Sequence, residues 1–208
     1  MIIKVCGINH DDNLKDLLAI PVDMIGFNFY PLSSRFLDHI PKVEPDHKHI
    51  KKTGIFVNAS MAEIIQKVKD YNLNLVQLHG DESPEFCMEL CSIIPVIKAI
   101  SIESESDIQK AMKYTMANYI LFDTKTSEFG GSGIKFKWDW IQTYEGKIPF
   151  LLAGGIGPED VYQISVLKHP KFYGVDINSR FEISPGIKDV SKVLKFTEFL
   201  KGLKKMNL

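Results

Sequence analysis

Residues 53–79 read TGIFVNASMAEIIQKVKDYNLNLVQLH, and this stretch indicates the class of fold. It holds two short apolar runs, 53–58 and 73–79, on either side of an amphipathic segment, 60–71. Ser60 precedes that segment with Glu63 three residues later, which is the spacing of a capping box at the start of a helix. A strand, a helix and a second strand in this order predict parallel strands joined by a helical crossover.

The same alternation extends along the chain in both directions. Runs with the length and composition of strands lie at 2–6, 23–29, 53–58, 73–79, 95–101, 118–123, 149–154 and 172–177. Helix-like segments follow most of them, at 11–20, 60–71, 83–92, 104–114, 157–168 and 190–205. Because eight parallel strands can close without leaving an edge, we expect residues 1–208 to form one domain, a (β/α)8 TIM barrel. A doubly wound open sheet is the alternative.

One crossover is poorly defined in the sequence. Between the second and third strands, residues 35–52 read RFLDHIPKVEPDHKHIKK, with prolines at 41 and 45 and weak apolar periodicity. Proline inside a helix removes a hydrogen bond and clashes with the preceding turn. We therefore expect the second helix to be shortened or replaced by irregular chain.

The composition favours a protein that handles small molecules. Of the 208 residues, 45% are hydrophobic and 25% are charged, and the formal net charge is −1, so no basic excess points to nucleic acid or anionic lipid. No apolar run approaches the roughly 18–20 residues that span a bilayer, and the N-terminus does not read as a secretory signal. Three cysteines are too few for a disulfide framework, which predicts a cytoplasmic location. Cys87 and Cys91 are interpreted as packing residues rather than metal ligands.

Reactive and polar side chains stand where several of these strands end. Cys6 ends the first strand and Asp123 the sixth, and a closed parallel barrel brings all such ends to one mouth, where barrel enzymes have their active sites. His79 follows the fourth strand, Asp176 lies near the end of the eighth, and Arg35 is in the loop after the second. Taken singly, each has a structural explanation, but together they predict a ligand site.

Glycine-rich turns add a candidate phosphate site. Gly154 and Gly155 follow the seventh strand and precede a helix, so their backbone N–H groups could surround an anion. Asn178 and Ser179 follow the eighth strand, where a short extra helix often completes a phosphate site in barrels. The long loop 124–136, TKTSEFGGSGIKF, comes directly after Asp123 and is interpreted as a lid.

The chain closely resembles the phosphoribosylanthranilate isomerase family of tryptophan biosynthesis. The matching segments are KVCGI (4–8), GFNFYPLSSR (26–35), GIFVN (54–58), VQLHGDE (76–82), LFDTK (121–125) with GGSG (130–133), LLAGGI (151–156) and GVDINS (174–179) with PGIKD (185–189). They follow the family order and cover nearly the whole chain. The family's fold is the (β/α)8 barrel reached above on other grounds.

The resemblance implies an Amadori rearrangement of N-(5'-phosphoribosyl)anthranilate, without a cofactor or metal. By family analogy, Cys6 is the general base and Asp123 the general acid, and Arg35 binds the anthranilate carboxylate. Gly154, Gly155, Asn178 and Ser179 match the phosphate loops, while His79 and Asp176 take supporting roles at the mouth.

The two catalytic roles make opposite demands. A free thiol is only slightly ionised at neutral pH, so Cys6 needs nearby positive charge, for which Lys4 on the same strand face is a candidate. Asp123 must keep its proton, which burial at a strand end would favour.

Some details depart from the family pattern, and rival functions remain. Arg180 stands where many members carry glycine, and IKFKWDW (134–140) aligns ambiguously with the family's shorter pattern. The related aminoaldose isomerase of histidine biosynthesis uses an aspartate at the end of the first strand and has similar halves. A phosphosugar aldolase or synthase would need a catalytic lysine such as Lys4, Lys98 or Lys125, and a non-catalytic barrel could bind a phosphorylated ligand. The partner is a small phosphorylated molecule, and the protein is a monomer or a homodimer.

Overall fold

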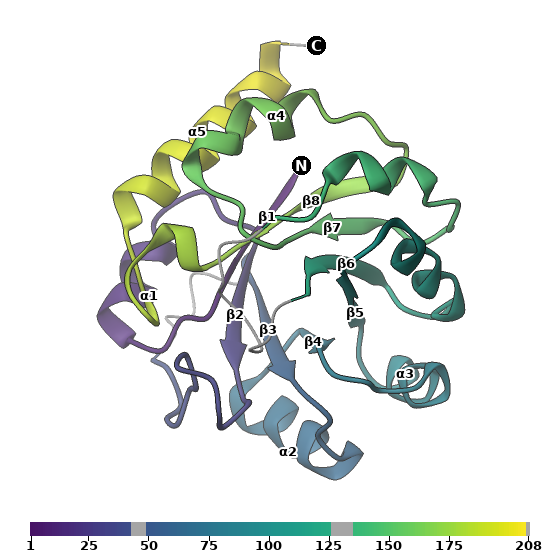
Figure 1. Cartoon of the computed structure of the whole chain (residues 1–208). Coiled ribbons are helices and arrows are strands. Elements are labelled where there is room, and N and C mark those ends of the chain that lie inside the picture. The colour runs from purple at the N-terminus through teal and green to yellow at the C-terminus, as the bar shows by residue number, and fades with distance from the viewer. Residues whose placement is uncertain (43–48, 126–134, 207–208) are drawn as a thin grey trace.

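The structure is a computed structural model that describes residues 1–42, 49–125 and 135–206. Parallel strands form the centre and helices surround them (Figure 1). The strands are β1 Ile2–Cys6, β2 Met24–Asn28, β3 Lys51–Phe56, β4 Leu75–Leu78, β5 Val96–Ile102, β6 Tyr119–Thr124, β7 Phe150–Leu152 and β8 Phe172–Ile177. The α-helices are α1 Asp11–Leu18, α2 Met61–Tyr71, α3 Pro84–Cys91, α4 Val161–Val166 and α5 Val190–Met206.

Several crossovers contain 3-10 helix. These elements are η2 Glu105–Lys113 after β5, η3 Trp138–Thr143 after β6, η4 Pro158–Asp160 before α4 and η5 Ser179–Phe181 after β8. A short antiparallel pair, β9 Glu182–Ser184 and β10 Ile187–Lys188, precedes α5. None of the described helices combines the length and the apolarity needed to cross a membrane.

The sheet closes on itself. Each strand pairs in parallel with the next, and β8 returns to β1 with Lys4 opposite Asp176 and Val5 opposite Ile177. This closed order confirms the predicted (β/α)8 barrel and excludes the doubly wound sheet, in which β1 and β8 would not be paired. The assignment of residues 1–208 to one domain stays a prediction.

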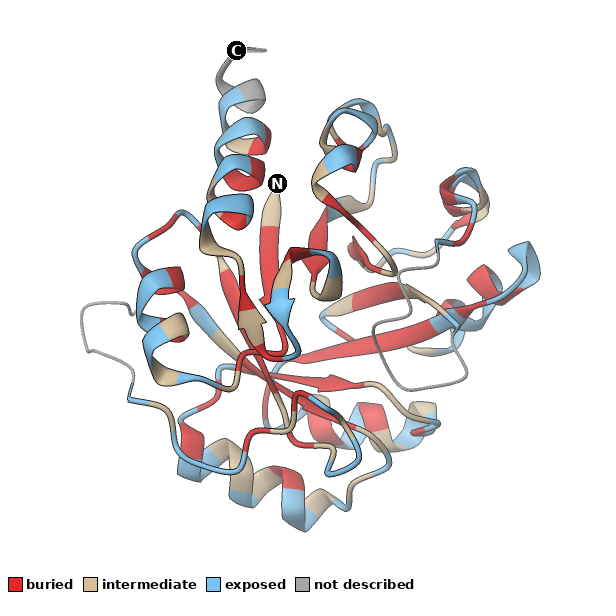
Figure 2. Cartoon of the chain, turned by 60° about the vertical axis from the view of Figure 1, so that its left-hand side comes forward, coloured by how far each residue is buried: buried red, intermediate tan, exposed pale blue. Residues whose placement is uncertain are grey.

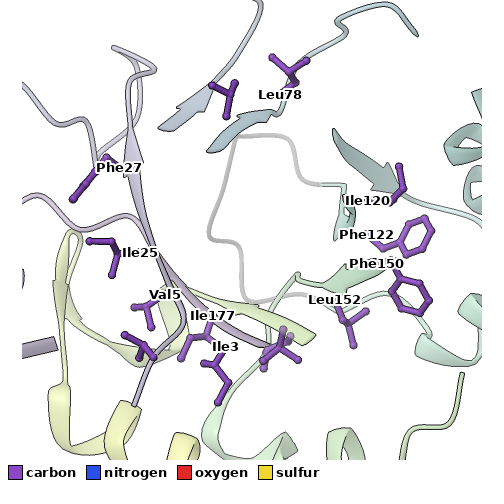
Figure 3. Packing of buried hydrophobic residues seen from close by; sticks show 14 of the residues in the cluster. Ile3, Val5, Ile25, Phe27, Leu78, Ile120, Phe122, Phe150, Leu152 and Ile177 are labelled. Atoms are coloured by element: carbon purple, nitrogen blue, oxygen red, sulfur yellow. The ribbon is translucent and has the colours of Figure 1, made fainter. Parts of the chain in front are cut away.

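Alternate residues of each strand face two different apolar layers. One set packs outward against the helices, as Figure 3 shows for Val5, Ile25, Phe122 and Phe150. The other set fills the inside of the barrel, where the buried residues are Met24, Leu75, Ile97, Ala99, Leu121, Leu151 and Ala153. The strands are therefore buried on both faces, which explains their near-continuous apolar sequences (Figure 2).

The helix starts follow the sequence signals. The Ser60 side chain accepts a hydrogen bond from the Glu63 amide, and the Ser60 amide donates to Glu63 Oε2 at 2.8 Å, which completes the predicted capping box of α2. At the start of α3, the Ser83 side chain accepts from the Phe86 amide, and Pro84 is in the first turn. Such caps satisfy backbone donors that have no partner within the helix.

Two crossovers differ from a regular β/α unit. Between β2 and β3, the described residues 29–42 and 49–50 contain no helix, as the two prolines predict. The segment 104–114, read as a helix from its periodicity, forms the 3-10 helix η2. The Asp107 carboxylate accepts from the Glu103 and Ser104 amides at 2.9 and 2.8 Å and fixes the start of this helix.

Candidate active site

A cavity opens at the carboxyl ends of the strands. Cys6 from β1 and Asp123 from β6 both line it, although they are far apart in the sequence. Its lining also contains predicted site residues from three other segments: His79, Gly154, Gly155, Asp176, Asn178 and Ser179. The remaining lining residues are Asn28, Tyr30, Ile55, Val57, Gln77, Ala153 and Ile156.

Cys6 is buried, and its environment favours the neutral thiol. Burial raises the pKa of Cys6, although the neighbouring ammonium groups of Lys4 and Lys188 act in the opposite direction. Lys4 is thus close to the thiol, as its position two residues earlier on the strand predicts. Its charge does not outweigh the loss of solvation, so the ligand-free protein holds Cys6 with its proton.

Lys4 is at the same time paired with a carboxylate. Its Nζ donates to Asp176 Oδ2 at 2.6 Å, and the two side chains are 0% and 6% exposed. Burial alone would lower the pKa of Lys4, but Asp176 and Cys6 together raise it, so the ammonium keeps its charge. The other carboxylate oxygen, Asp176 Oδ1, is buried and has no hydrogen-bond partner among the described atoms. A buried oxygen without a donor, on a residue that lines the cavity, is available to a ligand hydroxyl.

Asp123 is held by a backbone amide and by His79. Its Oδ1 accepts from the Thr124 amide at 2.9 Å, and its Oδ2 lies 3.2 Å from His79 Nε2. The Gln77 amide nitrogen lies 2.8 Å from His79 Nδ1. The imidazole ring therefore lies between the Gln77 amide and the Asp123 carboxyl group. Gln77 and His79 thus orient the carboxyl group.

Arg35 lies beside the cavity rather than in its lining. Its Nε and one terminal nitrogen donate to the two oxygens of Glu182, at 2.9 and 2.7 Å. Arg35 is 8% exposed, so this bidentate ion pair is nearly buried. The anthranilate-binding role carried over from the family stays a prediction, and one edge of its guanidinium is occupied by a carboxylate of the protein itself.

The glycine turn after β7 has the geometry of a backbone cradle. Gly154 and Gly155 have φ angles of 84° and 66°, in the region that side chains rarely adopt. A Cβ on Gly154 would lie 2.6 Å from the Thr124 backbone nitrogen, so the β7 loop contacts the end of β6 directly. The η5 turn, which begins at Ser179, supplies the short helix expected after β8.

Two other sequence-based interpretations concern Arg180 and the loop 124–136. Arg180 donates to Glu159 Oε1 at 2.7 Å, and both side chains are about half exposed, so this arginine is an exposed ion-pair partner here. Most of the proposed lid, including GGSG at 130–133, lies outside the described residues.

Sequence reasoning missed Glu182 and Lys188. Lys188 Nζ contacts Glu182 Oε1 at 2.5 Å and Asn178 Oδ1 at 2.6 Å, and its side chain is fully buried. Both residues lie after the eighth strand, where the chain forms β9 and β10. The signal for Lys188 in the sequence is PGIKD, one of the segments that match the family.

These features define a class of protein: a (β/α)8-barrel enzyme with titratable groups and a glycine cradle around one mouth. Residues 3–199 match the sequence profile of N-(5'phosphoribosyl)anthranilate (PRA) isomerase, and the chain belongs to this family. It is 41% identical to the N-(5'-phosphoribosyl)anthranilate isomerase of Parabacteroides distasonis over 204 residues, covering 95% of this chain and 92% of the relative.

Solved structures agree with the family assignment. The phosphoribosyl anthranilate isomerase of Thermotoga maritima superposes with a TM-score of 0.84 at 34% identity, covering 97% of this chain and 100% of the other. A second isomerase structure, in complex with reduced 1-(o-carboxyphenylamino)-1-deoxyribulose 5-phosphate, gives a TM-score of 0.80 at 30% identity, with coverage of 97% and 100%.

Proposed function

We propose that this protein is a phosphoribosylanthranilate isomerase of tryptophan biosynthesis (EC 5.3.1.24). It converts N-(5'-phosphoribosyl)anthranilate into 1-(2-carboxyphenylamino)-1-deoxyribulose 5-phosphate. The observation that carries this proposal is that Cys6 and Asp123 line one cavity in a chain that belongs to the isomerase family. An acid and a base beside one bound sugar are what an aldose-to-ketose rearrangement requires.

Each catalytic group moves one proton. Asp123 protonates the furanose ring oxygen, the C1'–O bond breaks, and an iminium ion forms. Cys6 then removes the proton from C2', which gives an enolamine that tautomerises to the ketone. After these steps Asp123 is a carboxylate and Cys6 is a thiol.

Cys6 is also a thiol in the ligand-free protein, because burial keeps its proton. Asp123 Oδ1 accepts a hydrogen bond from the Thr124 amide, and Asp123 Oδ2 lies beside His79 Nε2. The pair holds one proton, and this proton must return from the thiol to the carboxyl group before the next substrate reacts. The cavity is open to solvent at the strand ends, which gives a route for this return.

The remaining predicted residues bind and orient. Gly154 and Gly155, with Asn178 and Ser179 opposite, line the end of the cavity where backbone N–H groups can take the phosphate. The unpartnered Asp176 Oδ1 is suited to accept from a sugar hydroxyl. Arg35 takes the anthranilate carboxylate. The cytoplasmic location and the choice between monomer and homodimer stay predictions.

The rival activities are less consistent with the site. A histidine-pathway isomerase would have an aspartate where Cys6 stands. Of the lysines available to an aldolase, Lys4 is paired with Asp176 and Lys98 with Glu82, so neither is a free amine nucleophile.

The test is an isomerase assay that follows the loss of phosphoribosylanthranilate fluorescence. Cys6→Ser and Asp123→Asn should each lower kcat by about 10²–10⁴-fold, because each removes one positioned acid or base. Cys91→Ser on α3 and Asp139→Asn on η3 make the same chemical changes away from the cavity and should keep the wild-type rate. Wild-type turnover in either active-site variant would contradict the assignment.

A further inference from the structure

A buried ionic cluster lies behind the cavity and contains two groups without an assigned role. Arg35 and Lys188 both donate to Glu182, and Lys188 also donates to Asn178. The side chains of Arg35, Glu182 and Lys188 are 9%, 5% and 0% exposed. Taking three charges out of water is costly, and apolar side chains could fill the same space with similar stability. The cluster therefore needs an explanation beyond packing.

Glu182 fixes Arg35 in one orientation. Its Oε1 accepts from Arg35 Nε, from Lys188 Nζ and from the Gly186 amide at 3.0 Å, while Oε2 accepts from the terminal NH2 of Arg35. Four donors hold this carboxylate, so it cannot turn away from the guanidinium. Its pKa lies below the usual range, because hydrogen bonds from Arg35 and Lys188 outweigh the effect of burial.

The other edge of the guanidinium is left for a ligand. The second terminal nitrogen, NH1, has Ser34 Oγ at 3.5 Å, which is long for a hydrogen bond. A guanidinium has five N–H donors and can bind one carboxylate on its Nε edge and another end-on. The arginine arm also lies against the backbone that follows Cys6: a Cβ on Gly7 would be 2.6 Å from Arg35 Cδ and 2.9 Å from Asn178 Oδ1.

We propose that Glu182 is a positioning residue for substrate recognition: it holds Arg35 so that the free edge of the guanidinium meets the carboxylate of the aromatic ring. Lys188 supports this ion pair by neutralising Glu182, and it also holds Asn178 in the phosphate loop. The two ends of the substrate, carboxylate and phosphate, are thereby set at a fixed distance by one rigid cluster. This inference rests on the proposed function, because it assumes that Arg35 binds the anthranilate carboxylate.

The test compares two ligands that differ only in that carboxylate. They are reduced 1-(o-carboxyphenylamino)-1-deoxyribulose 5-phosphate and the same compound with a plain phenyl ring. The ratio of their dissociation constants measures carboxylate recognition and is insensitive to losses that affect both ligands equally. In the wild type, a charge-assisted bidentate contact should make this ratio about 10–100.

Three variants test the positioning role. In Glu182→Gln the ratio should fall at least about fivefold, because Arg35 loses its anchor. The double variant E182Q/K188M removes one negative and one positive charge, so the buried net charge is unchanged and the ratio should stay low. Glu182→Asp retains the charge but retracts the carboxylate, and it decides the question if Glu182→Gln does not fold. Glu89→Gln, exposed on α3, removes the same charge far from the cluster and should keep the wild-type ratio.

The possible results separate the two proposals. A wild-type ratio near one would show that Arg35 does not recognise the carboxylate, and it would overturn both the assigned role and the inference. A high wild-type ratio that persists in E182Q/K188M and in Glu182→Asp, while both ligands bind more weakly, would leave the role of Arg35 intact and reduce Glu182 to a structural residue. Loss of the ratio in the Glu182 variants, but not in Glu89→Gln, supports positioning.

Discussion

Replacing Lys4 by Met should destabilise the barrel by about 3–5 kcal/mol. Lys4 Nζ lies 2.6 Å from Asp176 Oδ2 and both side chains are nearly inaccessible, so the variant leaves a carboxylate buried without its cation. Removing one partner of a buried ion pair costs this much because the remaining charge keeps its desolvation penalty. For a chain of this size, about 2–4 °C of melting temperature per kcal/mol gives a decrease of about 6–20 °C.

The loss of stability in Lys4→Met should depend on pH, and the direction of this dependence follows from the pKa of Asp176. Burial raises the pKa of Asp176 above its usual value, while Lys4 acts to lower it, so the pKa rises further when Lys4 is absent. Between the Asp176 pKa of the unfolded chain and the higher pKa of the folded protein, the folded protein binds more protons. The free energy of unfolding therefore falls as the pH rises through this range. The deficit of Lys4→Met should be smallest near pH 4 to 5 and largest near pH 8.

Urea titrations at several pH values measure this, with two control variants. Lys4→Met with Asp176→Asn removes both charges and should recover most of the loss. Lys201→Met breaks the ion pair with Asp23, in which both side chains are about one third exposed, and should cost less than about 1 kcal/mol. A deficit for Lys4→Met below about 1 kcal/mol, or one that does not change with pH, would refute the buried-pair interpretation.

Two further predictions concern reactivity and backbone strain. Burial raises the pKa of Cys6 and raises that of Cys87 to about 12. The rate at which iodoacetamide alkylates each thiol, followed by mass spectrometry, should therefore still increase with pH above pH 9. A rate for Cys6 that levels off near pH 8 would contradict this. Gly154→Ala should cost about 1–3 kcal/mol and weaken phosphate binding, because its φ is 84° and the added Cβ meets Thr124. Gly202→Ala on α5 has no atom within 4 Å of the added Cβ and should leave the melting temperature unchanged or higher; an equal loss in both variants would argue against strain at Gly154.

The architecture could be predicted because its signals are local and repeated. Apolar runs of strand length, caps such as Ser60 with Glu63, and proline at the start of α3 can each be read within a few residues. Closure follows from the number of parallel strands rather than from any single contact. The type of helix was harder to predict: the amphipathic segment 104–114 suits a 3-10 helix as well as an α-helix, because both place side chains three residues apart on one face.

The candidate site was predictable where it depends on position along a strand. Cys6 and Asp123 were found because residues at the ends of parallel strands meet at one mouth. The ion pairs could not be predicted, because they join residues that are distant in sequence. Arg35 and Glu182 are 147 positions apart, and Lys4 and Asp176 are 172 positions apart. Charge alone does not say which carboxylate a buried lysine will meet. Lys4 lies beside Cys6 and lowers the pKa of the thiol, but its ammonium is also paired with Asp176, and burial has the larger effect on Cys6.

The placement of the buried charges argues that they serve the site. Among the described residues, the buried pair of Lys4 with Asp176 and the buried cluster of Glu182 with Arg35 and Lys188 lie at or beside the mouth of the barrel. The barrel interior below them is filled by Met24, Leu75, Ile97, Leu121 and Leu151. Apolar residues of similar volume often replace a buried ion pair without loss of stability, so stability alone does not explain these charges. Ion pairs differ from apolar contacts in fixing the direction of each group, and direction is what an acid, a base and an arginine fork need when they must face one small substrate.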